Sequence, residues 1–307
     1  GVRLGAINPN VFQDQIYKNG SLGNPDADIR KAALNHILDC IEIGKQTGSR
    51  DVSLWFGDGS SYPGSASIRK RKQWFAEGLH EAHNHLSPTQ RLLVEYKPFE
   101  PYFYHTDMGD WGMALVTARH AGPQAKVLVD TGHHYQAQNV EQIVAWLLSE
   151  DMLGGFHFND RRYADDDLTL GSIDPYQAFR IFNEMICFEW ETGKRVDIGY
   201  MIDQSHNLKN KLEEMIQTAM TAQELYAKAV LVDHEKLNHH QMKGELLDGE
   251  ECLKAAFATD VRPAIREWRK SKGLAEEPLQ AFRASGYTAR AERERGAKNK
   301  GSVASYA

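Results

Sequence analysis

The stretch AKVLVD at residues 125–130 decides the fold class of this chain. It is almost continuously apolar, as a strand buried on both faces of a parallel sheet should be. A similar run, RLLVEYK, occupies residues 91–97, and a helical pattern at about 110–120 lies between the two. A strand, a helix and a second strand in this order indicate a parallel α/β sheet.

The same alternation continues toward both ends of the chain. The predicted strands are 4–8, 51–56, 91–97, 125–130, 154–159 and 196–202, and the predicted helices begin near residues 27, 67, 110, 139 and 175. This α/β rhythm predicts a (β/α)8 barrel. Six strands are two fewer than a closed barrel contains, so we expect the chain to supply about six βα units and to lack roughly two N-terminal ones. A separate N-terminal fragment of the same barrel is therefore a candidate partner.

The pattern divides the chain into three segments. Residues 1–207 are predicted to form the barrel strands and the βα loops, which carry the active site. Residues 208–272 read as helices, and we expect them to pack on the barrel. Residues 273–307 are rich in Ala, Arg, Lys and Glu and contain few core formers, which predicts a charged tail or an oligomerisation arm.

Composition argues against two classes of partner. No apolar run approaches the roughly 20 residues that a membrane-spanning helix needs, so no membrane partner is expected. The 36 Lys and Arg residues against 42 Asp and Glu residues give a net charge of −6, which disfavours nucleic acid. Three widely spaced cysteines argue against a disulfide framework, and no signal segment is visible, so a cytoplasmic location is predicted.

Polar side chains that can bind metal ions follow the last four predicted strands. They are Glu95 and Lys97, then Asp130 with His133 and His134, then His157 with Asp160, and finally Asp203. The carboxyl ends of parallel strands meet at one face, where active sites of such folds form. Glu95 and His157 also interrupt apolar runs, and burying them is costly unless they are paired or bind a metal.

Two further patterns extend this predicted metal face. In Asp130-Thr-Gly-His133 the aspartate ends a strand, and the glycine lets the histidine turn back over the same cavity. The acidic run at 165–167 follows His157, and Asp165 and Asp167 are spaced to hold one cation. A solvated loop is the plainer interpretation of this run, but its place above a metal face favours a second cation.

Five motifs in this order resemble those of aldose–ketose isomerases of the xylose isomerase type, and L-rhamnose isomerases in particular. They are VEYKP at 94–98, DTGHH at 130–134, GFHFND at 155–160, YADDD at 163–167 and GYMID at 199–203. The resemblance runs from about residue 1 to residue 207. Xylose isomerases proper have Glu where this chain has Asp130 and Asp where it has His157, so the rhamnose branch fits better.

The resemblance implies a role for each motif residue. A first metal ion would be bound by Glu95, Asp130, His157 and Asp203, and a second by His133, Asp165 and Asp167. Lys97, Asp203 and His133 would be catalytic, and Trp55, Lys97 and Asp203 would contact the sugar. The family also implies a homotetramer and two divalent cations, with Mn²⁺ expected and Co²⁺ or Zn²⁺ as alternatives.

The implied reaction converts L-rhamnose to L-rhamnulose, and related aldoses to ketoses, by a metal-assisted hydride shift between C1 and C2. Divalent cations stabilise the charge that develops on the two substrate oxygens, and no organic cofactor is required. A metal-dependent phosphoesterase of the AP-endonuclease type would share the barrel and the His, Asp and Glu cluster. The third alternative is a truncated chain with a structural or binding role, which would bind metal without converting a substrate. Metal-dependent sugar isomerisation separates these three.

Overall fold

The structure is a computed structural model of the 307-residue chain. It describes residues 3–100, 104–204 and 208–295. The chain divides into two compact units, Gly1–His206 and Asn207–Ala307. Within the described ranges, every helix is either too short or too polar to cross a bilayer.

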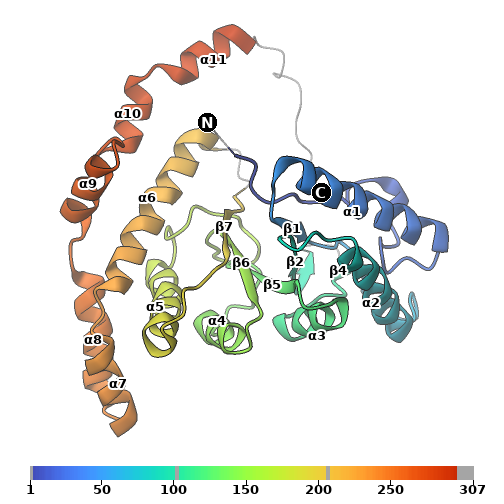
Figure 1. The fold of residues 1–307 in the computed structure, drawn as a ribbon, viewed down its shortest axis with the longest axis horizontal. Coiled ribbons are helices and arrows are strands. Elements are labelled where there is room, and N and C mark those ends of the chain that lie inside the picture. The colour runs from blue at the N-terminus through green and yellow to red at the C-terminus, as the bar shows by residue number, and fades with distance from the viewer. Residues whose placement is uncertain (1–2, 101–103, 205–207, 296–307) are drawn as a thin grey trace. The chain divides into compact units, whose positions relative to one another are not determined.

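The first unit is built around a parallel sheet of five strands in the order β1-β2-β5-β6-β7 (Figure 1). The strands are β1 (Asp51–Leu54), β2 (Arg91–Glu95), β5 (Ala125–Asp130), β6 (Leu153–Phe158) and β7 (Gly199–Ile202). All four pairings between neighbours are parallel. Together with its helices the sheet forms a half-barrel, which confirms the predicted α/β architecture.

The predicted strand at residues 4–8 is reduced to a single bridge. The N–H of Ile7 donates to the carbonyl of Asp51 at 3.0 Å, and its carbonyl accepts from the N–H of Ser53 at 2.9 Å. Pro9 follows two residues later and has no N–H with which to extend the ladder. The described sheet therefore contains five strands instead of the six that we predicted.

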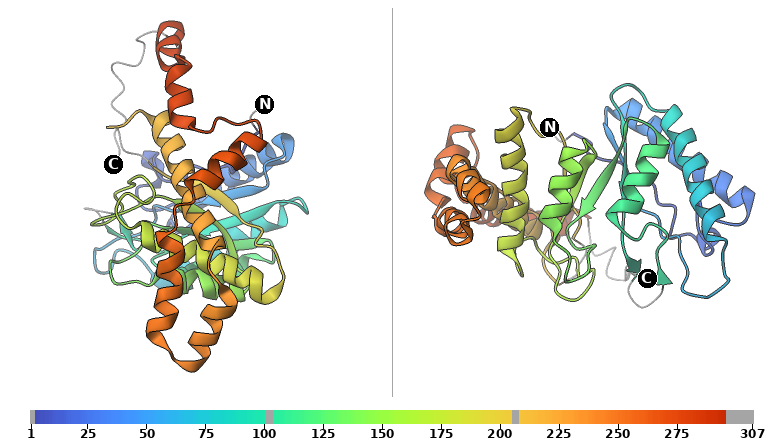
Figure 2. Two further views of the ribbon diagram at one scale, coloured as in Figure 1. Left: turned by 90° about the vertical axis from the view of Figure 1, so that its left-hand side faces the viewer. Right: turned by 90° about the horizontal axis from the view of Figure 1, so that it is seen from below.

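Five helices form an arc around the outer side of this sheet (Figures 1 and 2). They are α1 (Ala27–Thr47), α2 (Ile68–Asn84), α3 (Trp111–Ala121), α4 (Val140–Ser149) and α5 (Pro175–Thr192). Each begins at its predicted start or one residue after it, because polar N-caps such as Asp110 and Asn139 accept backbone hydrogen bonds there. Helix α3 packs closely on α2, and α4 on α5, whereas α3 and α4 approach each other less closely.

Charged side chains tie the strands together at the amino-terminal end of the sheet. The Arg91 guanidinium donates to Oδ1 of Asp51 at 2.7 Å and to the carbonyls of Asp197 and Gly154 at 2.9 and 3.1 Å. Arg50 donates to Oδ1 of Asp197 at 2.7 Å. These bonds connect β1, β2 and β6 with the segment that enters β7. The polar groups of the site lie at the opposite end of the sheet, where the strands have their carboxyl ends.

A short antiparallel hairpin follows β2, and the sequence patterns did not predict it. It consists of β3 (Phe99–Glu100) and β4 (Tyr104–His105). A strand of two residues is too short to show an alternating pattern of apolar and polar residues. The prolines in this stretch therefore predicted only a loop. The hairpin matters because it places Glu100 beside Lys97, where its carboxylate accepts a hydrogen bond at 2.7 Å.

The second unit contains helices only, within its described residues. They are α6 (Lys211–Val230), α7 (His234–Lys243), α8 (Leu246–Ala258), α9 (Arg262–Ser271), α10 (Pro278–Ala284) and α11 (Tyr287–Arg295). Helix α6 packs against α8, α9 and α10. Residues 273–307 thus include two short helices, while 296–307 lie outside the described residues. The predicted roles of 208–272 and 273–307 stay predictions.

Candidate active site

Four predicted metal ligands come together at the carboxyl ends of four strands. Glu95 ends β2, Asp130 ends β5, His157 lies one residue before the end of β6, and Asp203 directly follows β7. One ligand atom from each lies within 4.8 Å of the others. The first three side chains are buried, whereas half of the Asp203 side chain is exposed. This ligand group is therefore buried on one side and open to solvent at Asp203.

The imidazole of His157 lies among the three carboxylates of this group. Its Nδ1 is 3.1 Å from Oε1 of Glu95, 3.5 Å from Oδ2 of Asp203 and 3.9 Å from Oδ2 of Asp130. Burial alone would lower the pKa of His157, but the carboxylates, with Glu95 foremost, raise it to about 9. The protonated ring supplies positive charge beside carboxylates that a bound metal ion would otherwise neutralise.

A second group shares Asp130 and adds His133 and Asp165, again with ligand atoms within 4.8 Å of one another. Nδ1 of His133 lies 3.0 Å from the carbonyl of Tyr96. When Nδ1 donates its proton there, Nε2 keeps a free lone pair for a metal ion. Nε2 lies 3.3 Å from Oδ1 of Asp165, yet this buried oxygen accepts no well-directed hydrogen bond from the described residues. Two ligand atoms that face each other at this distance suit a shared cation.

The acidic loop uses its three aspartates differently. Oδ2 of Asp166 accepts the backbone N–H groups of Arg162 and Tyr163 at 2.5 and 2.7 Å, so this residue holds the loop in shape. Asp165 instead faces His133. Asp167 is not in either ligand group, and its Oδ1 lies 3.3 Å from the amide nitrogen of Asn159. Its predicted role as a ligand of the second metal stays a prediction.

The charges of the site explain the pKa shifts of its buried acids. Burial raises the pKa of Glu95, but the imidazoles of His157 and His133 outweigh this and lower it to about 2. The pKa of Asp130 is raised to about 7, chiefly by burial and also by Glu95 and Asp165. Positive charge nearby is what keeps buried carboxylates such as these ionised. Asp130, which both ligand groups share, is the one whose ionisation burial and its acidic neighbours oppose most.

Lys97 and Trp55 lie beside the two ligand groups. The ammonium of Lys97 is 2.7 Å from Glu100 and 2.6 Å from Asp165, and these carboxylates raise its pKa although burial opposes them. It also lies over the Trp55 ring at 5.1 Å from the centroid. Nε1 of Trp55 is buried without a hydrogen-bond partner among the described residues, and Phe12 packs edge-on against the ring. The site thus combines a fixed cation with an aromatic face.

Asn159 is a site residue that the sequence patterns missed. Its amide nitrogen donates to Oδ1 and Oδ2 of Asp130 at 3.0 and 3.1 Å and so orients the shared carboxylate. Gly132 makes this contact feasible, because a Cβ there would lie 2.7 Å from Oδ1 of Asn159. The position of Asn159 after β6 was the available signal, but many asparagines end strands. Asp160, by contrast, accepts the N–H groups of Ile173 and Asp174 and anchors a loop.

A family model and two related sequences agree on the family of this chain. The model of the family described as "Xylose isomerase-like TIM barrel" matches residues 1–190. A probable sugar isomerase of Rhizobium meliloti (strain 1021) is 41% identical over 300 residues, which cover 96% of this chain and 70% of that protein. A probable sugar isomerase of Mesorhizobium japonicum is 40% identical over 307 residues, covering 98% of this chain and 71% of the relative.

Among solved structures, the 3-keto-D-glucoside 4-epimerase YcjR of E. coli superposes on this chain with a TM-score of 0.56. The match covers 73% of this chain and 80% of that one at 13% sequence identity, so it bears on the fold alone. The family model matches more than half of the chain. The two relatives are 41% and 40% identical in sequence over nearly all of it. This chain belongs to the xylose isomerase-like TIM-barrel family.

Proposed function

We propose that this protein is a metal-dependent aldose–ketose isomerase that converts L-rhamnose to L-rhamnulose and acts on related aldoses. The observation that carries the proposal is the pair of ligand groups that share Asp130 beside Lys97 and Trp55. Two relatives named as probable sugar isomerases support the reaction class. The choice of L-rhamnose depends on the motifs, above all on Asp130 and His157 as ligands.

Two divalent cations are proposed as cofactors, with Mn²⁺ expected and Co²⁺ or Zn²⁺ as alternatives. Glu95, Asp130, His157 and Asp203 would hold the first, and Asp130, His133 and Asp165 would form the core of the second. Mixed carboxylate and imidazole ligands suit these ions. When bound, the cations supply stabilisation for the negative charge that develops on O1 and O2 of the sugar.

The protein's own groups would act on the substrate from one side. Lys97 lies two residues beyond β2, and Glu100 and Asp165 hold its ammonium in place, so it would polarise the carbonyl at C1 or C2. The Trp55 face would support the carbon chain of the sugar. Asp203, at the exposed edge, would contact the substrate as it enters. His133 would remain neutral while it ligates a metal ion.

The test is isomerisation of L-rhamnose by the purified protein with Mn²⁺, followed as ketose formation. Protein treated with a chelator is the control, and Mn²⁺ should restore its activity. A panel of aldoses under the same conditions gives the preferred sugar as the highest kcat/KM. Bis(p-nitrophenyl) phosphate and DNA with an abasic site test the phosphoesterase alternative. Phosphodiester cleavage without sugar isomerisation would refute the proposal, and so would metal binding without turnover of any aldose.

A further inference from the structure

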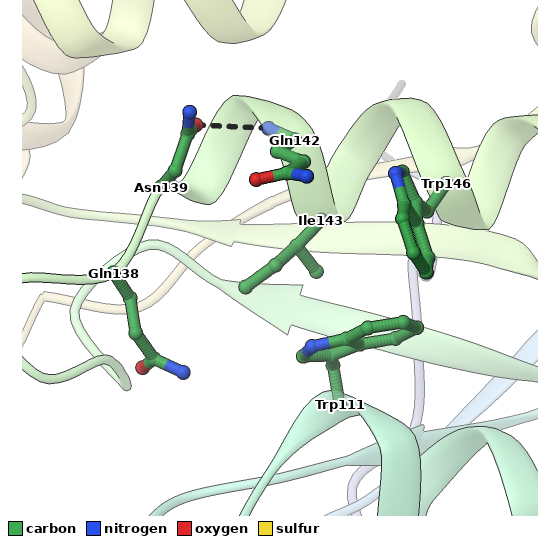
Figure 3. Close-up of a pocket in the computed structure, with 6 residues that line it drawn as sticks. All are labelled: Trp111, Gln138, Asn139, Gln142, Ile143 and Trp146. Atoms are coloured by element: carbon green, nitrogen blue, oxygen red, sulfur yellow. Dashed lines mark hydrogen bonds between the residues drawn. The ribbon is translucent and has the colours of Figure 1, made fainter.

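A pocket of about 230 Å³ opens between helices α3 and α4 (Figure 3). It is lined by Trp111, Gln138, Asn139, Gln142, Ile143 and Trp146. These residues lie at the start of α3, in the loop that enters α4, and along the first two turns of α4. They belong to neither ligand group of the candidate active site.

Two indole rings form the aromatic part of the pocket lining. The Trp111 and Trp146 rings lie with their centroids 5.7 Å apart and their planes at 84°. Trp146 is 54% exposed, although a large apolar ring gains free energy when it is covered. Ile143 is buried and adds apolar surface to the lining. The exposed Trp146 ring therefore presents apolar surface to solvent.

Three amide side chains complete the rim of the pocket. Oε1 of Gln138 accepts the N–H of Tyr135, and Oδ1 of Asn139 accepts the N–H of Gln142. These bonds fix both side chains and leave the NH₂ group of each without a partner in the described part of the chain. The Gln142 amide makes no hydrogen bond with any described residue. Figure 3 shows the Ile143 side chain between the Gln142 amide and the Trp111 ring.

This combination of groups selects a chemical class of ligand. The Gln142 amide offers a donor and an acceptor side by side, which matches vicinal hydroxyl groups, and the Gln138 and Asn139 amides each add an NH₂ donor. An indole face packs against a ring of C–H groups, and its N–H gives one more donor. No lining residue is charged, so nothing in the lining attracts an ionic ligand. The volume is below the roughly 300–1,000 Å³ typical of pockets for drug-sized molecules, which points to a ligand of one small ring.

We propose that this pocket is a second carbohydrate-binding site, which takes one neutral sugar in its closed pyranose form. The site is separate from the isomerisation centre, although its Gln138 lies on the loop that leaves β5 and carries His133. It goes beyond the proposed function because it would bind a ring that is not isomerised. It would accept a free monosaccharide or the terminal unit of a glycan.

The probe is methyl α-L-rhamnopyranoside, whose locked ring has no aldehyde to isomerise. In protein labelled with ¹⁵N at tryptophan, the indole N–H signals of Trp111 and Trp146 are identified by replacing each residue with Phe. Both signals should shift with saturation as the glycoside is added. Gln142→Ala should weaken binding about tenfold, because it removes two hydrogen bonds. The signal of Trp190, an exposed tryptophan on α5, serves as the matched control and should not move.

Three outcomes would overturn the proposal. The first is no shift of the two signals with the glycoside, and the second is an equal shift with cyclohexanol, which has the ring but a single hydroxyl. The third is a change with protein concentration alone and a matching change in sedimentation, which would assign the pocket to a second copy of the chain. The same titration after chelation separates the two proposals, since loss of isomerase activity leaves binding at this pocket intact. A trisaccharide ending in L-rhamnose distinguishes a glycan terminus from a free sugar.

Discussion

Oη of Tyr96 lies 2.6 Å from Nε2 of His134, and both side chains are buried. The hydrogen bond connects the residue after Glu95 with the residue after His133, so it joins the two ligand-bearing segments. Burial, with Arg161 and His133, lowers the pKa of His134 to about 3, so its ring is neutral. In the tautomer that carries its proton on Nδ1, the neutral ring accepts a hydrogen bond from the Tyr96 hydroxyl at Nε2. The carbonyl of Tyr96 meanwhile orients the His133 ring.

We expect Tyr96→Phe to loosen the segment that carries His133 without removing a ligand. The affinity of the second metal group should fall about tenfold or more, as is usual when an outer hydrogen bond that orients a ligand is lost. Titration with Mn²⁺, followed by electron paramagnetic resonance, measures the two sites separately. Tyr135→Phe, on the exposed part of the same loop, is the matched control. Unchanged binding at both sites in Tyr96→Phe would contradict the positioning role.

Glu95→Gln and Asp203→Asn should each abolish metal-dependent activity while the fold persists. Each change removes one negative charge from the first ligand group and nearly preserves the side-chain shape. Circular dichroism checks the fold, and metal analysis checks the stoichiometry. Asp151→Asn is a suitable control, because this side chain is 99% exposed and lies in a turn. Full activity and full metal content in both ligand variants would end the metal-site hypothesis.

Lys97→Met should lower turnover while both metal ions remain bound. The ammonium is proposed to polarise the carbonyl oxygen of the sugar, and loss of one such group typically lowers kcat by about 10²–10³. Metal content and KM should change much less than kcat. An unchanged kcat would remove Lys97 from the mechanism and leave it as the partner of Glu100 and Asp165.

Metal binding should release protons near neutral pH. Without metal, the carboxylates raise the pKa of His157 to about 9, so this ring is protonated at about pH 7.5, and Asp130 and Asp165 raise the pKa of His133 in the same direction. Both must be neutral to ligate, so affinity should rise with pH up to about 9 and fall as the pH is lowered. Calorimetry in buffers of different ionisation enthalpy counts the protons. Affinity that does not change between about pH 7 and pH 8 would refute this charge assignment.

The chain is expected to form a homotetramer. Trp268 on α9 is 47% exposed, and Phe282 on α10 is half-buried against Tyr287, so the second unit offers apolar surface for a contact. Analytical ultracentrifugation at micromolar concentration should show the tetramer, and Trp268→Ala should weaken it. A monomer in this experiment would argue against assembly through this unit.

Much of the fold could be predicted from the sequence because its signals are local. A buried parallel strand such as 125–130 reads as a continuous apolar run, and the helices begin at capping residues such as Asp110 and Asn139. The segment at 4–8 looked equally like a strand, but whether such a run pairs over several residues depends on its neighbours. There Pro9 stops the ladder after one bridge. The β3–β4 hairpin was too short to leave a pattern.

The sequence by itself determined which residues stand at the carboxyl ends of the strands, because the chain order and the strand period are enough to place Glu95, Asp130 and His157 there. Only the tertiary structure decided how these groups are shared. It places Asp130 in both ligand groups, directs Asp165 inward while Asp166 holds its own loop, and sets Lys97 between two carboxylates. The physical reason is that such contacts depend on distances between segments far apart in the chain, and no local pattern of residues encodes them.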